Sequence, residues 1–394
     1  MSALTDAASS AVPFRGAGNG AAAIDVVHDT RAPGHFGCDR RARLRHVVCD
    51  ASAAASVRSA GLPYPDIMQT RILGRTGREV SVIGLGTWQL GADWGEVLEE
   101  DAIAVLEASV DAGVTFFDTA DVYGDGRSEQ LIGRFLAANP QLDITVATKM
   151  GRREAQDAAN FTLAKFREWT DRSRRNLGTD TLDLVQLHCP PTSVLSTDAV
   201  YDALDTLVEE GAIANYGVSV ETADEALAAI ARPHTATVQI ILNAFRLKPL
   251  DAVLPAARAA GVGIIARVPL ASGLLTGKYT RETTFAENDH RNYNRDGSHF
   301  DVGETFSGVD YEEGLAAAAE FAALVPEGVT PAQAALAWVA GLDGVSSVIP
   351  GARSVEQARG NAHAGTGIPL GDGFDAAVHE IYDRHFRAAI HGRW

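Results

Sequence analysis

Four side chains that can hold or exchange protons stand at or just after the ends of apolar runs. Asp118 ends one run, and Tyr123 follows five residues later in FFDTADVYG. Lys149 ends the next run and His188 ends a third. Tyrosine titrates near about 10 and a neighbouring ammonium favours the phenolate, so Lys149 is expected to lower the pKa of Tyr123 toward working pH. The four residues predict acid–base chemistry in which Tyr123 gives a proton to a carbonyl oxygen or takes one from an alcohol.

The partners of Tyr123 have roles that follow from their chemistry. Asp118 is expected to hold the Lys149 ammonium in place and keep it charged, while His188 donates a hydrogen bond to the negative charge that develops on the substrate oxygen. The whole chain has only four lysines. Lys149, at the end of an apolar strand, is therefore not expected to be an ordinary solvent-exposed lysine. Each residue alone also has an ordinary structural interpretation, as a helix cap, a packed ring or a hydrogen-bonded side chain.

A zinc site built from Asp118, His188 and Cys189 is a weaker interpretation of the same region. Lys149 in its midst would repel the cation, and Cys189 points to the opposite side of a strand that continues from His188. The sequence therefore predicts no metal.

The elements that must position these residues alternate regularly. Short apolar runs rich in β-branched residues are separated by longer amphipathic runs, which predicts eight strand–helix units. Near-continuous apolar strands indicate burial on both faces, so the expected fold is α/β, a (β/α)8 TIM barrel, with an open doubly wound sheet as the alternative. In such barrels the chemistry lies at the carboxyl ends of the strands. The expected strands are 81–87, 114–120, 144–150, 182–188, 212–220, 235–245, 261–270 and 345–351, and the expected helices are 97–113, 128–139, 161–177, 198–210, 222–231, 251–260, 311–324 and 331–342.

The first 67 residues differ in composition from the rest of the chain. They contain neither Lys nor Glu and show no helical or strand period, so residues 1–67 are predicted to be a disordered or non-native extension, and the barrel domain is expected to span 68–394. The domain begins with TRILG, the turn RTGR and EVSVIG, which predict a short β-hairpin. Met68 is a candidate initiator, and a genuine flexible tail is the rival interpretation. The pair Arg40 and Arg41 lacks the apolar region of an export signal.

Charge and composition exclude several classes of partner. A formal net charge of −17 argues against nucleic acid and acidic membranes, because phosphate binding needs clustered cations. No apolar run is long enough to span a membrane. The cysteines are too few and scattered for a disulfide framework, which favours a reducing, cytoplasmic setting; they are Cys38, Cys49 and Cys189.

From about Met68 to Arg387 the sequence resembles the aldo-keto reductases, in particular the bacterial type with an N-terminal hairpin. The family's catalytic tetrad falls on the same four residues found by position and chemistry. The segments that carry the resemblance are GLGTW at 84–88, DTADVYGDGRSEQLIG at 118–133, ATKMG at 147–151, DLVQLHCPP at 183–191, YGVS at 216–219, VPLASGLLTGKY at 268–279 and IPGARSVEQARGN at 349–361.

The resemblance also implies a nicotinamide cofactor and the residues that hold it. Ser219 and Gln239 would hold the carboxamide, and Arg267 would lay its guanidinium against the ring. An Arg beside the 2′-phosphate implies NADPH/NADP+ over NADH, because a fork of donors matches a phosphate, although Arg353 in GARS is equally explained as part of a plain anion nest. The pyrophosphate would lie along Pro269, Leu270, Ser272, Gly273, Leu275 and Lys278, and the adenosine phosphate end would meet Gly351, Arg353, Gln357 and Asn361.

The chain departs from the family pattern at two positions. Val220 stands where many relatives have an Asn that contacts the carboxamide, and Arg267 replaces an aromatic residue that stacks on the ring. The G-L-G run at 84–86 lacks the third glycine of a dinucleotide fingerprint, so it is not a Rossmann motif. We expect Trp88 to form an apolar wall of the substrate pocket, with plain packing of the barrel mouth as the alternative.

These features predict an oxidoreductase that interconverts a small-molecule aldehyde or ketone and an alcohol. A second class is a cofactor-binding regulatory or scaffold subunit of the same fold with little turnover, and a third is a barrel lyase or isomerase without a nicotinamide. The loop 271–310 contributes to the pocket without a readable pattern, so the sequence names neither the substrate nor the oligomeric state.

Overall fold

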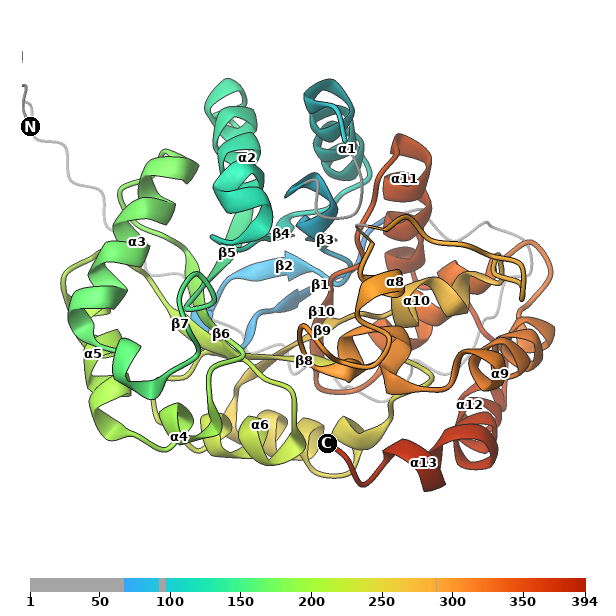
Figure 1. The fold of residues 1–394 in the computed structure, drawn as a ribbon. Helices are drawn as coiled ribbons and strands as arrows, with labels where there is room; N and C mark the ends of the chain where they lie inside the picture. Colours follow the sequence, from blue (N-terminus) through green and yellow to red (C-terminus); the bar gives the residue numbers. More distant parts are fainter. Residues whose placement is uncertain (1–66, 92–96, 288) are drawn as a thin grey trace, which may run out of the picture. The chain divides into compact units, whose positions relative to one another are not determined.

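The computed structural model describes residues 67–91, 97–287 and 289–394. The predicted extension, residues 1–67, lies outside the described residues except for Ile67. A short antiparallel hairpin precedes the barrel, with β1 (Thr70–Ile72) and β2 (Glu79–Ser81) paired in the register Thr70 to Ser81 (Figure 1). At its turn Gly74 has φ 52°, and a Cβ there would lie 2.0 Å from the backbone nitrogen of Gly263, so the turn packs closely on the barrel. The predicted hairpin is confirmed.

Eight parallel strands follow one another around a single sheet in sequence order. The first and last strands meet through parallel bridges that join Ile83 to Val348 and Gly86 to Gly351, which closes the barrel. A Cβ at Gly86 would lie 2.9 Å from the Ile349 carbonyl oxygen, so a glycine permits this closure. The predicted barrel is confirmed and the open sheet is wrong. The strands are β3 (Leu85–Gly86), β4 (Phe116–Asp118), β5 (Thr145–Met150), β6 (Leu184–His188), β7 (Tyr216–Ser219), β8 (Thr237–Ile241), β9 (Gly263–Arg267) and β10 (Val345–Val348).

Helices surround the sheet (Figure 1). Several begin at a threonine whose hydroxyl accepts a backbone N–H of the first turn, as Thr162, Thr222 and Thr330 do. The helices after β10 are elements that the sequence analysis did not predict. The helices are α1 (Glu99–Asp111), α2 (Arg127–Ala138), α3 (Leu163–Leu177), α4 (Thr192–Leu195), α5 (Asp198–Glu209), α6 (Ala223–Ile230), α7 (Val253–Ala260), α8 (His290–Tyr293), α9 (Tyr311–Leu324), α10 (Pro331–Gly341), α11 (Val355–His363), α12 (Phe374–Tyr382) and α13 (Ala388–Ile390).

The segment between β9 and α9 contains only short helical pieces. They are the turn Ala271–Thr276, the helix α8 and the turns Val302–Glu304 and Phe306–Gly308. Just after β9, Val268 has φ 53°, which is unusual for a β-branched side chain. Such conformations persist only where the surrounding structure holds them, and this one lies at the carboxyl end of the barrel.

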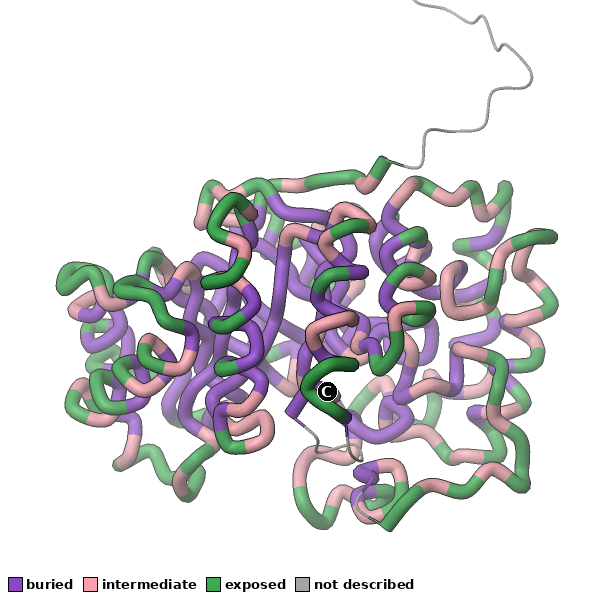
Figure 2. The backbone as a smooth tube through the Cα atoms, turned by 90° about the horizontal axis from the view of Figure 1, so that it is seen from above, coloured by how far each residue is buried: buried purple, intermediate pink, exposed green. Residues whose placement is uncertain are grey.

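The strands form the buried centre of the barrel, as Figure 2 shows in purple. Every residue of β5, β6, β8 and β9 is buried, which accounts for their near-continuous apolar sequences. In the described ranges, no helix combines the length and apolar character needed to cross a membrane.

Candidate active site

The four predicted proton-handling residues lie together at the carboxyl end of the barrel. Asp118 ends β4, Lys149 lies near the end of β5 and His188 ends β6. The Lys149 Nζ atom donates to Asp118 Oδ1 at 2.6 Å and to the Tyr123 hydroxyl at 3.3 Å. The Tyr123 and His188 rings meet edge to face with centroids 5.9 Å apart. Carboxylate, ammonium and phenol therefore form one hydrogen-bonded chain, with an imidazole beside the phenol.

Burial sets the acidity of this chain. Burial works to lower the pKa of Lys149, but Asp118 and Tyr123 outweigh it and raise that pKa, so the ammonium stays charged. Burial raises the pKa of Tyr123, and the opposing effect of Lys149 is smaller. The expectation that the ammonium would bring the pKa of Tyr123 below its ordinary value is thus wrong for this structure, because the phenol is deeply buried. Tyr123 is a neutral acid at neutral pH.

His188 is also held in its neutral form. Burial lowers its pKa well below the ordinary value, and the nearby cations Arg152, Lys149 and Arg267 act in the same direction. The buried Nδ1 atom has no hydrogen-bond partner among the described residues. A neutral imidazole carries one N–H, so His188 has a single hydrogen bond to donate.

Two glutamines donate hydrogen bonds to the Asp118 carboxylate. Asp118 Oδ2 accepts a hydrogen bond from Gln239 Nε2 at 2.8 Å and one from Gln186 Nε2 at 3.2 Å. Gln186 was not among the predicted residues, although its place on β6 between apolar neighbours marks it as buried and polar. Ser219, the other predicted carboxamide contact, lies with its hydroxyl 3.5 Å from the Cys189 sulfur.

A cavity of about 640 Å³ joins these residues to the loops after β9 and β10. Two predicted residues do not line it: Lys149 and Leu275 are each 1% exposed, and Leu275 packs in the hydrophobic core. The Leu275 side chain is therefore not available to contact a ligand in the cavity. The predicted residues that line the cavity are Trp88, Asp118, Tyr123, His188, Ser219, Gln239, Arg267, Pro269, Leu270, Ser272, Gly273, Lys278, Gly351, Arg353, Gln357 and Asn361.

The far end of the cavity suits a phosphate. Neither Lys278 nor Arg353 takes part in an ion pair with another residue that the structure describes. Gln357 Oε1 accepts from the Arg353 backbone N–H at 2.8 Å, and Asn361 Nδ2 donates to the Gly351 carbonyl at 3.1 Å. The helix α11 begins there with Ser354 as its cap, so its positive end also faces this region.

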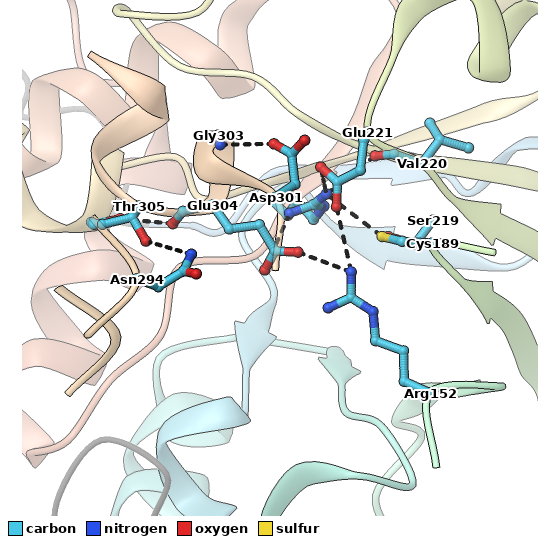
Figure 3. Close-up of polar contacts among 12 residues, drawn as sticks. Arg152, Cys189, Ser219, Val220, Glu221, Asn294, Asp301, Gly303, Glu304 and Thr305 are labelled. Carbon is cyan, nitrogen blue, oxygen red and sulfur yellow. Dashed lines mark hydrogen bonds and ion pairs between the residues drawn. The ribbon is translucent and has the colours of Figure 1, made fainter. Parts of the chain in front are cut away.

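Arg267 is occupied by protein partners. Its Nη2 atom donates to Glu221 Oε2 at 2.8 Å and to the Val220 carbonyl at 3.1 Å. Figure 3 shows Arg152 facing the carboxylates of Glu221 and Glu304, and Arg267 Nη1 lies 3.8 Å from Glu304 Oε2. Val220 thus contributes its backbone oxygen to the site. The sequence analysis missed Arg152, Glu221 and Glu304, although Arg152 and Glu221 follow β5 and β7 at the rim where polar residues were expected.

The oxygens of Glu221 and Glu304 and the Cys189 sulfur lie within 4.8 Å of one another, a spacing that a metal ion could bridge. The guanidinium groups of Arg152 and Arg267 already contact these carboxylates and would repel a cation. Burial raises the pKa of the Cys189 thiol to about 12, so it is not a ready thiolate ligand. This cluster is better described as a charge network.

Comparison with known proteins identifies the family to which the chain belongs. The model of the aldo/keto reductase family matches residues 82–383. The chain is 33% identical over 233 residues to the aldo-keto reductase YhdN of Bacillus subtilis, covering 57% of this chain and 69% of the relative. It is 31% identical to a probable voltage-gated potassium channel subunit beta of Oryza sativa, covering 77% of this chain and 93% of that protein.

A solved structure extends the comparison to a cofactor. The aldo/keto reductase from Klebsiella pneumoniae in complex with NADP and acetate superposes with a TM-score of 0.58 at 26% identity, covering 80% of this chain and 96% of that one. The eight-stranded barrel, the strand-end side chains and these matches agree. The chain belongs to the aldo/keto reductase family.

Proposed function

We propose that this protein interconverts an aldehyde or ketone and an alcohol, with NADP(H) as the hydride carrier and Tyr123 as the general acid and base. The observation that carries the proposal is the buried chain from Asp118 through Lys149 to the Tyr123 hydroxyl. The hydroxyl faces a cavity whose far end holds Lys278 and Arg353, which form no ion pair with a described residue. A nicotinamide cofactor, when bound, supplies the hydride. NADP in the Klebsiella pneumoniae relative supports the choice of cofactor.

The cavity residues fit such a cofactor. Ser219 and Gln239 would hold the carboxamide, beside Arg267. Arg353 would favour the 2′-phosphate of NADPH, since a guanidinium offers a fork of donors to a phosphate. The pyrophosphate would meet Pro269, Leu270, Ser272, Gly273 and Lys278, with the backbone of Leu275 behind them, and Gly351, Gln357 and Asn361 would complete the adenosine phosphate end.

The proton chemistry follows from the electrostatics of the site. Tyr123 is protonated at neutral pH because burial raises its pKa, so it has a proton to give to a carbonyl oxygen. The phenolate that remains is stabilised by the Lys149 ammonium at 3.3 Å, which Asp118 holds. His188, neutral and beside the ring, donates its one hydrogen bond to the same oxygen.

A cofactor-binding subunit with little turnover is the second candidate, and the likeness to a probable potassium channel subunit beta favours it. The connected Lys149 and Tyr123 groups favour turnover instead, because a scaffold has no need of a buried ammonium against a phenol. We propose further that the catalytic domain spans residues 68–394, that the protein acts in the cytoplasm and that its partner is a small carbonyl compound.

The test is consumption of NADPH with a panel of aldehydes and ketones by the wild-type protein and by Tyr123→Phe. Wild type is expected to turn over, and the variant to lose about 10²- to 10⁴-fold in kcat, the range of general acid catalysis. Near-normal activity of Tyr123→Phe would contradict the role of Tyr123. No turnover of any carbonyl by the wild type, together with tight NADPH binding, would favour the subunit.

A further inference from the structure

The segment 301–308, which lies before α9, brings a cavity residue into place on an unusual backbone. Glu304 lines the cavity from this segment. Phe306 and Ser307 have φ 52° and 57°, a conformation that residues other than glycine rarely adopt. Such a backbone persists only where the surrounding structure holds it. The conformation of this segment therefore depends on what packs against it.

On the cavity side, hydrogen bonds connect the segment to residues of the site. The Ser272 hydroxyl donates to the Glu304 carbonyl at 3.0 Å and accepts from the Phe306 N–H at 3.0 Å. The Glu304 carboxylate accepts from Arg152 at 3.1 Å and shares a hydrogen bond with the Glu221 carboxyl, whose pKa burial raises to about 7. Ser272 lines the cavity and is a proposed contact of the cofactor pyrophosphate. A shift of the segment would therefore displace Ser272 and Glu304 together.

Away from the cavity, the indole of Trp394 packs on the same segment. Its Nε1 atom donates to Asp301 Oδ1 at 3.2 Å, and Asp301 also accepts from the Gly303 N–H at 2.7 Å (Figure 3). A Cβ at Gly303 would lie 3.0 Å from the indole, and one at Gly308 would lie closer still. Trp394 is 9% exposed and does not line the cavity. The two glycines thus let the ring lie directly against the backbone of the segment.

Arg246 fixes the indole in place. Its guanidinium carbon lies 3.9 Å from the centroid of the Trp394 ring, and its Nη2 atom donates to the Glu221 carbonyl. Arg246 is 1% exposed, forms no ion pair with a described residue, and has Nε and Nη1 atoms without a hydrogen-bond partner there. Burial lowers its pKa to about 10, so the guanidinium is still charged at neutral pH. An indole face is the aromatic surface that best stabilises such a cation. The contact therefore holds Trp394 and Arg246 to each other.

We propose that Trp394 is a positioning residue, which holds the segment 301–308 in the conformation that receives the cofactor. It packs against Arg246 on the barrel, and in this way keeps Ser272 and Glu304 at the cavity. This inference rests on the proposed function. Without the indole the segment would adopt other conformations as well, and NADPH would bind only the fraction of molecules in the competent one.

The test measures two properties of Trp394→Ala: the Kd for NADPH, by NADPH fluorescence, and amide hydrogen exchange of residues 301–308 in the free protein. If the competent conformation falls to about a tenth of the population, the Kd rises about tenfold. Exchange in the segment should become about tenfold faster, while exchange in the barrel strands stays as in wild type. At saturating NADPH, kcat should remain within about threefold of wild type, because the residues around the reacting group are unchanged.

A conservative variant separates the ring face from the hydrogen bond. Trp394→Phe keeps an aromatic face for Arg246 but loses the hydrogen bond to Asp301. It should recover most of the affinity, with a Kd within about threefold of wild type. If Trp394→Ala does not fold, Trp394→Leu, which keeps apolar bulk without a ring face, takes its place with the same expected results.

Trp338→Phe is the matched control. Trp338 is 5% exposed and its Nε1 atom donates to Asp375 Oδ1 at 3.0 Å, but this contact joins α10 to α12 and Trp338 does not line the cavity. The control should keep the wild-type Kd and the wild-type exchange of 301–308. Wild-type values of both in Trp394→Ala, or faster exchange spread over the whole barrel, would overturn the inference. Failure of the wild type to bind NADPH would count against the proposed function instead, and exchange of 301–308 would still test the role of Trp394.

Discussion

The two ends of the cavity handle charge in opposite ways. At the end near Tyr123, the cations Lys149, Arg152 and Arg267 are each bound to a carboxylate. At the other end, Lys278 and Arg353 form no ion pair with any described residue. The cations at the first end have carboxyl partners within the protein, whereas Lys278 and Arg353 have none among the described residues. The difference indicates that an anionic group such as a phosphate binds at the end that holds Lys278 and Arg353.

The two groups of cations also differ in what the loss of a partner would cost the folded protein. A buried ammonium or guanidinium without a partner costs several kcal/mol, so the cations near Tyr123 need their carboxylates in the folded protein. Lys278 and Arg353 are exposed, and water solvates them until an anion replaces it. Substitutions at the first end should therefore change catalysis and stability, whereas those at the second should change affinity.

The largest effect is expected from Lys149→Met. Without the ammonium, the Tyr123 phenolate loses its stabilising partner and Asp118 is left buried and uncompensated. We expect kcat to fall about 10²- to 10⁴-fold, measured by NADPH oxidation at saturating substrate. Lys165→Met, which removes a surface lysine paired with Glu154, is the control. A Lys149→Met protein that folds and keeps kcat within about threefold of wild type would refute the account of this end.

Asp121 differs from the paired groups at the Tyr123 end of the cavity. It is a buried carboxyl two residues before Tyr123 whose oxygens accept no hydrogen bond from a described residue. Burial raises its pKa to about 7. In the unfolded chain the pKa is about 3.9, so the folded state holds an extra proton between these values, and stability falls as pH rises from about 4 to 7.

Asp121→Asn should remove this pH dependence. Relative to the variant, wild type is expected to lose on the order of 2–4 kcal/mol of unfolding free energy between pH 5 and pH 8, measured by denaturant titration. Asp111→Asn, at an exposed position of α1, should parallel wild type. Parallel pH curves for wild type and Asp121→Asn would show that the Asp121 carboxyl is compensated.

A smaller effect is expected from Arg353→Gln at the other end. The loss of a charge-assisted contact to the 2′-phosphate should raise the Kd for NADPH about 10- to 100-fold and leave NADH nearly unchanged. Both constants can be measured by titration of protein fluorescence. Arg359→Gln changes an exposed arginine of α11 outside the cavity and serves as the control. An equal increase in the Kd for NADH and the Kd for NADPH would show that Arg353 does not contact the 2′-phosphate.

The sequence predicted the barrel and the residues at its strand ends well, for a physical reason. Parallel strands buried on both faces leave few polar residues, so Asp118, Lys149 and His188 stand out where each run ends. The barrel brings the ends of the neighbouring strands β4, β5 and β6 together. The spacing of these residues along the sequence alone does not predict that they meet.

Other features depended on tertiary contacts that have no local signal. The Glu304 to Arg152 contact joins residues 152 positions apart, and Glu304 lies in a segment without a regular period. The direction of the Tyr123 pKa could not be predicted either, because it depends on how far the barrel mouth buries the phenol. Leu275 was placed by its motif, but the turn Ala271–Thr276 directs it into the core.

The most direct test of the division between the two ends is an NADPH titration of Tyr123→Phe and Arg353→Gln, followed by fluorescence. Tyr123→Phe removes only a hydroxyl at the reacting end, so it is predicted to bind NADPH within about twofold of wild type, whereas Arg353→Gln should bind about tenfold or more weakly. A loss of affinity in Tyr123→Phe as large as that in Arg353→Gln would contradict the account.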